Sequence, residues 1–169
     1  DLASRNILVS ASRICKIGDF GMARHMQHAS DVYERRSRNT KIPVRWMAPE
    51  VLLCNSFTSQ SDVYSFGILM WEIVTLGSTP YRHLKTEQIV DAVARNGERP
   101  TRPDYCHALV YNLMSNCWAA EPKARPTFGQ LVSKLDELLL SSNEYIELDQ
   151  YPDHNYYNIP AQMAPEELV

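Results

Sequence analysis

Two short β-prone runs open the chain, at residues 6–9 and 14–17, and the polar stretch 10–13 between them is typical of a turn. The pattern predicts a β-hairpin that delivers Asp19 onto the loop after its second strand. Residues 22–45 are polar and charged without a clear period. A stretch of that length without periodicity favours a long functional loop.

Helical periodicity dominates the chain after this loop. The strongest predicted helix begins near Ser59 or Ser61, either of which would cap it, and ends at Gly77. Its apolar residues recur at helical spacing and its flanks are apolar too, so we expect burial on nearly all sides. Further helices are predicted over residues 49–53, 87–95, 108–118 and 128–140. The expected fold class is mainly α, with one short β-hairpin.

The composition changes at about residue 141. Beyond it the chain is rich in Tyr, Asp, Asn and Pro and has little periodicity, which is typical of disordered segments. We therefore expect one folded unit over residues 1–140 and a disordered, acidic, tyrosine-rich tail over residues 141–169. The total length of 169 residues agrees with a single domain.

Charge is unevenly placed, although the net charge is only −3. Six Lys or Arg and two acids lie between Arg24 and Arg45, whereas the stretch from Glu144 to Val169 holds six acids and no Lys or Arg. A basic loop and an acidic tail suit different functions, and the plain alternative for each is a solvated surface. No apolar run approaches the roughly 18 residues of a membrane span. The four cysteines form no Cys-x-x-Cys pair, so neither zinc ligation nor a disulfide framework is expected.

The first residues of the chain carry the most informative spacing. Asp1 and Asn6 stand five positions apart, and Asp19-Phe20-Gly21 follows thirteen residues after Asn6. This spacing resembles the catalytic loop and the Mg²⁺-binding turn of protein kinases. In phosphoryl transfer a carboxylate orients the attacking hydroxyl and accepts its proton, which is the role expected for Asp1. Asn6 and Asp19 would supply oxygen ligands for the metal. The alternative is an Asx turn at each end of the hairpin.

Further motifs resemble the C-terminal lobe of protein tyrosine kinases over about residues 1–140. Ala3 stands where serine/threonine kinases usually have Lys, and residues 43–50 resemble the substrate-docking loop of the tyrosine-specific branch. The run from Trp71 to Gly77, followed by Pro80-Tyr81, indicates the receptor subgroup near the FGF, VEGF and RET receptors.

This resemblance implies an ATP- and Mg²⁺-dependent receptor tyrosine kinase that acts on protein tyrosines and signals by autophosphorylation after self-association. It implies no nucleic-acid partner. The implied roles are the catalytic base and its neighbour for Asp1 and Arg5, metal and nucleotide binding for Asn6 and Asp19, substrate positioning for Pro43, Arg45 and Trp46, and structural roles for Asp62, Glu50 and Arg125. Glu50 and Arg125 resemble a buried ion pair of the family. Asp62 resembles an acceptor for the catalytic-loop backbone.

Tyrosines supply the expected regulation. Tyr33 lies in the basic loop, where a phosphate would pair with arginines and order the chain, so its phosphorylation is expected to activate the enzyme. The alternative is a solvated loop tyrosine. In the tail, Tyr145, Tyr156 and Tyr157 resemble docking sites for SH2-domain adaptors. The alternative to adaptor docking is that this part of the tail packs on the lobe and is structural. The tail also resembles that of cadherin-related receptor kinases of arthropods.

Some features of the family are missing or altered. The Gly-rich loop, the phosphate-pairing Lys and the His-Arg before Asp1 are absent from the sequence, so we expect a fragment that is inactive alone and belongs to the cytoplasmic part of a plasma-membrane receptor. Ser4 replaces the commoner Ala, and Arg82-His83 replaces the usual Pro-Gly. Two other functions stay open, namely a pseudokinase scaffold and a short interaction protein that acts through its tail tyrosines.

Overall fold

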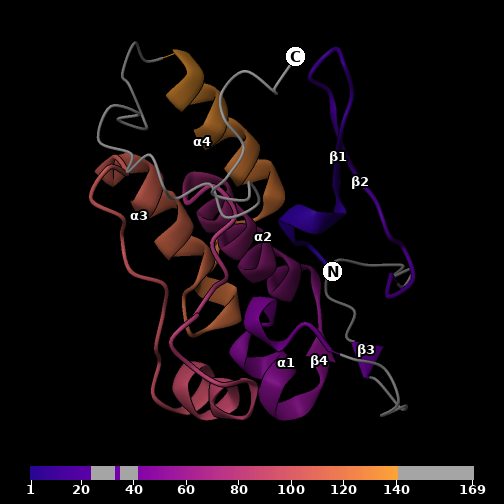
Figure 1. The fold of residues 1–169 in the computed structure, drawn as a ribbon, viewed down its shortest axis with the longest axis vertical. Helices are drawn as coiled ribbons and strands as arrows, with labels where there is room; N and C mark the ends of the chain where they lie inside the picture. The colour runs from indigo at the N-terminus through magenta and orange to yellow at the C-terminus, as the bar shows by residue number, and fades with distance from the viewer. Residues whose placement is uncertain (24–32, 35–41, 141–169) are drawn as a thin grey trace, which may run out of the picture.

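The computed structural model describes residues 1–23, 33–34 and 42–140. Within them, four α-helices pack together and two small antiparallel sheets lie at the edge of the helical body (Figure 1). The helices are α1 (Pro49–Cys54), α2 (Ser59–Val74), α3 (Ala108–Cys117) and α4 (Phe128–Leu140). The strands are β1 (Ile7–Val9), β2 (Cys15–Ile17), β3 (Tyr33–Glu34) and β4 (Ser56–Phe57). The predicted fold class is confirmed.

The predicted hairpin forms from β1 and β2, with Ile7 paired to Ile17. Inside the predicted long loop, β3 pairs with β4 and places the backbone of Tyr33 opposite Phe57. A 3₁₀ turn at Val44–Trp46 ends that loop. The loop is therefore attached to the helical body at two points.

Helix α2 is the central element (Figure 1). As predicted it is covered on nearly all sides, with only Asp62 and Ile73 exposed along its length. The predicted capping residues were wrong, because Thr58 is the N-cap. Its hydroxyl accepts a hydrogen bond from the Ser61 backbone at 3.1 Å, and the Ser61 hydroxyl accepts one from the Thr58 backbone at 2.9 Å. This reciprocal capping box satisfies two donors that the helix itself leaves unpaired.

Close packing fixes α2 against α3. Gly67 lies so near Trp118 that a Cβ placed on it would stand 2.6 Å from the indole nitrogen. Only a glycine allows this approach. Val63, Tyr64 and Ile68 of α2 then join Leu113 and Met114 of α3 in the buried core.

The helix predicted over residues 87–95 has a different geometry. A 3₁₀ turn at Thr86–Gln88 leads into a π-helix at Val90–Arg95. The backbone N–H of Asn96 donates to the carbonyl of Asp91, five residues earlier. Ala92 and Val93 are buried here, and apolar spacing does not distinguish a wide helical turn from a regular one.

Candidate active site

The first six residues fold into a tight turn that fixes the side chain of Asp1. The turn ends in a 3₁₀ segment at Ser4–Asn6, and the Asn6 backbone donates to the carbonyl of the buried Ala3 at 2.9 Å. Arg5 Nη2 donates to both carboxylate oxygens of Asp1, at 2.7 and 2.8 Å. Asn6 Nδ2 donates to the Asp1 carbonyl at 2.9 Å. The Asp1 side chain is 10% exposed and that of Arg5 is 45% exposed. A pair open to water on one side adds little stability, so its effect is to orient the carboxylate.

The hairpin brings the two expected metal ligands to one end of the site. Gly18 N donates to the carbonyl of Asn6 at 2.7 Å, which closes the hairpin just before Asp19. Asp19 adopts a left-handed backbone with φ of 53°, a conformation that Asp tolerates better than most residues. One of its carboxylate oxygens accepts the Gly21 N–H at 3.1 Å. Within the described ranges, no hydrogen bond reaches its other oxygen, which is therefore available to a ligand there.

The donor set of this site fits Mg²⁺ bound to a nucleotide. Within the described ranges, no group of three or more His, Cys, Asp or Glu side chains is placed to hold a metal by itself. Asn6 and Asp19 offer one amide oxygen and a carboxylate. Mg²⁺ in kinases is commonly held by one or two such groups, with phosphate oxygens and water completing its octahedron.

Trp46 ties the expected docking loop to both the catalytic turn and α2. Its indole Nε1 donates to Glu72 Oε2 at 2.7 Å, and its backbone carbonyl accepts the Ser65 hydroxyl at 2.8 Å. The guanidinium of Arg5 lies 4.4 Å above the centre of its ring, in cation–π geometry. Pro43 stands just before this turn and lines the same cavity as Asp1.

Arg45 contacts a neighbouring turn of its own chain. Its guanidinium donates to the carbonyls of Pro80, Tyr81 and Leu84 at 3.0, 2.6 and 2.7 Å. Tyr81 has a φ of 51°, so these bonds hold a backbone conformation that a tyrosine rarely adopts. Any effect of Arg45 on a substrate would therefore pass through the placement of the docking loop.

The structure brings Glu50 and Arg125 together. Arg125 donates from Nη1 and Nη2 to the two carboxylate oxygens, at 2.6 and 2.8 Å. The Arg125 side chain is 0% exposed and that of Glu50 is 19% exposed. Arg125 also donates to the carbonyls of Gln60 and Ala119, both at 2.9 Å. The pair fastens α1 to the start of α2 and to the turn before α4.

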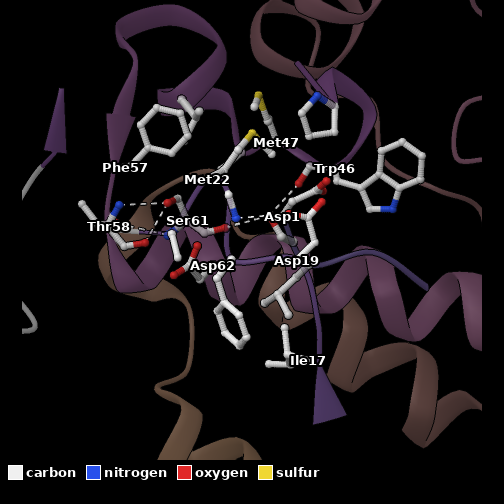
Figure 2. Close-up of a pocket in the computed structure, with 18 of the residues that line it drawn as sticks. Asp1, Ile17, Asp19, Met22, Trp46, Met47, Phe57, Thr58, Ser61 and Asp62 are labelled. Atoms are coloured by element: carbon white, nitrogen blue, oxygen red, sulfur yellow. Dashed lines mark hydrogen bonds between the residues drawn. The ribbon is translucent and has the colours of Figure 1, made fainter. Parts of the chain in front are cut away.

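A cavity of about 460 Å³ runs from the catalytic turn to the first turn of α2 (Figure 2). Asp1, Asp19 and Trp46 line one end, and Phe57 and Asp62 line the other. Asp62 is exposed to this cavity. Partial desolvation there raises the pKa of its carboxyl.

Glu72 is a residue of the site that the sequence analysis did not single out, because it appears there only within the run from Trp71 to Gly77. It is 4% exposed and accepts hydrogen bonds from Ser4 and Trp46. A usable signal was present, because Glu72 lies four residues after the buried Ile68 and thus on the same face of the helix. An acid on a buried face requires hydrogen-bond donors.

The regulatory tyrosines are only partly within the described residues. The backbone of Tyr33 is placed by its pairing with β4. Tyr145, Tyr156 and Tyr157 lie outside the described residues, as does the rest of the expected tail.

Comparison with known proteins identifies the family. The sequence model of protein tyrosine and serine/threonine kinases matches residues 1–135. The chain belongs to this family. Members of the family generally use ATP and Mg²⁺ and act on protein substrates.

The relatives are receptor kinases. The tyrosine kinase receptor Cad96Ca of Drosophila melanogaster is 50% identical over 159 residues, which cover 94% of this chain and 20% of that protein. Fibroblast growth factor receptor 1 of Xenopus laevis is 47% identical over 150 residues, 88% of this chain and 18% of that receptor. The same receptor of Pleurodeles waltl is 44% identical over 157 residues, 89% of this chain and 19% of that receptor.

The predicted resemblance to the C-terminal lobe of receptor tyrosine kinases is confirmed. The chain spans about a fifth of the length of these relatives. In the part of the chain that the structure describes, no helix has the length and apolarity to cross a membrane.

Proposed function

We propose that this chain is the catalytic C-terminal lobe of a receptor tyrosine kinase, which transfers the γ-phosphoryl group of ATP to the hydroxyl of protein tyrosines. The observation that carries the proposal is the turn in which Arg5 holds both oxygens of the Asp1 carboxylate, with Asn6 beside it and Asp19 at the end of the hairpin. A scaffold without catalysis would not need this arrangement.

Each residue then has a chemical role. Asp1 accepts the hydrogen bond and the proton of the acceptor hydroxyl, and Arg5 keeps its carboxylate turned toward that hydroxyl. Asn6 and Asp19 would hold Mg²⁺, which would neutralise charge on the phosphates of the bound ATP. Pro43 provides an apolar platform for the acceptor ring. Asp62 lines the far end of the cavity, and the hydrogen bonds that the resemblance implies from the catalytic-loop backbone to its carboxylate do not occur within residues 1–23, 33–34 and 42–140.

The test is phosphorylation of matched tyrosine and serine peptides by the full-length protein with Mg²⁺ and ATP. Asp1→Asn and Asp19→Asn are each expected to lower kcat for the tyrosine peptide by at least about 100-fold, because proton transfer and charge neutralisation contribute effects of that size. Asp104→Asn is the matched control, since Asp104 is exposed and does not line the cavity. Equal use of the serine peptide, or full activity of Asp1→Asn, would refute the proposal.

Regulation and partners belong to the same proposal. Phosphorylation of Tyr33 activates the kinase, since phosphate would pair with the arginines that neighbour it in the sequence. In the assay above, Tyr33→Phe is expected to lack the activation that preincubation with ATP gives the wild type. Phosphorylated Tyr145, Tyr156 and Tyr157 recruit SH2-domain adaptors, in a receptor that self-associates and carries this lobe on the cytoplasmic side of the plasma membrane. Unchanged adaptor capture after all three are replaced by Phe would contradict that role.

A further inference from the structure

Glu72 is a buried carboxylate that is held by hydrogen bonds from two separate loops. Its Oε2 accepts from the Ser4 backbone N–H at 3.0 Å and from Trp46 Nε1 at 2.7 Å. Its Oε1 accepts from the Ser4 hydroxyl at 2.8 Å. No ion pair to Glu72 occurs within residues 1–23, 33–34 and 42–140. Hydrogen-bond donors, and not an ion pair within these residues, therefore determine how the carboxylate is oriented.

The two loops that meet on Glu72 are the catalytic turn and the docking loop. Ser4 directly precedes Arg5 in the 3₁₀ segment. Arg5 in turn binds the Asp1 carboxylate and lies over the ring of Trp46. A closed set of contacts therefore runs from Glu72 through Ser4 to Arg5, and back through Trp46 to Glu72. A change in the orientation of Glu72 is transmitted to the guanidinium that orients Asp1.

The Ser4 hydroxyl is the adjustable member of this set. Oε2 has two donors, one of them a backbone N–H that any residue except proline would supply at position 4. The Ser4 hydroxyl is the donor to Glu72 Oε1. Glu72 itself is only 4% exposed. Without the hydroxyl, one oxygen of a buried carboxylate is left without that donor, and rotation of the carboxylate toward the remaining donors would move Trp46 and Arg5.

We propose that Ser4 is a positioning residue for the acceptor tyrosine. It acts through Glu72 and Trp46 on Arg5, and so sets the direction of the Asp1 carboxylate. The inference rests on the proposed function, because it assigns how that site orients its acceptor. Ser4 lies outside the nucleotide-binding pair Asn6 and Asp19, so its effect is on the peptide substrate and not on ATP.

The test uses steady-state kinetics of the full-length protein with a tyrosine peptide. Ser4→Ala is expected to lower kcat/KM for the peptide about three- to tenfold. This is the range expected when a hydrogen bond to a charged group is lost and relaxation of the site recovers part of its free energy. The KM for ATP is expected to stay unchanged. Ser4→Thr keeps the hydroxyl and is expected to stay within twofold of the wild type, roughly the error of such a comparison. Ser115→Ala, at an exposed position of α3, is the matched control.

A double-mutant cycle with Trp46→Phe tests the route through Glu72. The phenylalanine keeps a ring under Arg5 but removes the indole N–H. If both residues act by holding one carboxylate, the effects of Ser4→Ala and Trp46→Phe are expected to be non-additive. Additive effects, a peptide kcat/KM in Ser4→Ala equal to that of Ser115→Ala, or equal losses for peptide and ATP would overturn the inference alone. An inactive wild-type protein would refute the proposed function, and the inference with it.

Discussion

Removing Arg125 is predicted to be among the most damaging single changes in the fold. In Arg125→Met, the carboxylate of Glu50 loses both of its donors, and the carbonyls of Gln60 and Ala119 lose one donor each. The Arg125 side chain is 0% exposed and that of Glu50 is 19% exposed. Water therefore cannot take the place of the guanidinium and restore these hydrogen bonds. Breaking a buried pair from one side costs on the order of 3–5 kcal/mol.

The assay is thermal or urea unfolding of the chain. A loss of about 4 kcal/mol corresponds to a fall in Tm of roughly 8–16 °C for a domain of about this size. Arg95→Met is the matched control, because Arg95 forms an i,i+4 pair with Asp91 in which the two side chains are 66% and 59% exposed. That control is expected to lose less than about 1 kcal/mol.

A second comparison separates the charge from the packing. Replacing both partners, as in Glu50→Leu with Arg125→Met, leaves no unpaired charge and is expected to regain part of the stability that Arg125→Met loses. The reasoning would be refuted if Arg125→Met lowered the free energy of unfolding no more than Arg95→Met does. It would also be refuted if the effects of Arg125→Met and Glu50→Leu simply added in the double variant.

Two further predictions concern packing and pH. Gly67→Ala is expected to destabilise the chain by about 1–3 kcal/mol or more, because the added Cβ would lie 2.6 Å from Trp118 Nε1 and 2.7 Å from Cys117 Cβ. Gly129→Ala, whose Cβ would meet nothing closer than 3.9 Å, is expected to be neutral or stabilising in the same unfolding assay. Burial raises the pKa of the Cys117 thiol to about 12. An unfolded thiol ionises near about pH 8.5, so this contribution to stability is present below that pH and is lost as the pH rises toward 12. Urea midpoints measured from pH 7 to pH 11 are expected to fall above about pH 9, and less steeply in Cys117→Ala; parallel pH curves for the two proteins would contradict this assignment.

The sequence predicted the main helices from the helical spacing of their apolar residues, and the hairpin from two β-prone runs on either side of a polar turn. It failed where the outcome depends on a choice between similar neighbours. Thr58, Ser59 and Ser61 all carry a hydroxyl suited to capping, and only the backbone path decides that Thr58 is the N-cap. The π-helix at Val90–Arg95 was missed because buried residues at helical spacing fit either geometry.

In the candidate site too, some features follow from the sequence and others depend on contacts between residues far apart in it. Asp1, Asn6 and Asp19 are close in sequence. Their spacing pointed to the catalytic loop and the metal-binding turn, and two β-prone runs predicted the hairpin that carries Asp19. The partners of Arg45 are carbonyl oxygens from 35 to 39 residues away, which no side-chain pattern reveals. Glu72 lies 68 residues from Ser4, and its role depends on a contact between two loops and a helix. Sequence reasoning finds local chemistry more readily than the long-range contacts that support it.

The shared carboxylate of Glu72 also bears on how such a site can change over generations. Residue 4 contributes one donor from its backbone and one from its side chain, so a lineage can exchange serine for alanine or threonine in one step and keep the loop attached. Glu72 has no such freedom, because its replacement releases the catalytic turn and the docking loop at once. Variation is therefore expected to accumulate at position 4, while position 72 is held fixed. This holds although residue 4 is next to the catalytic residues in the sequence and residue 72 is far from them.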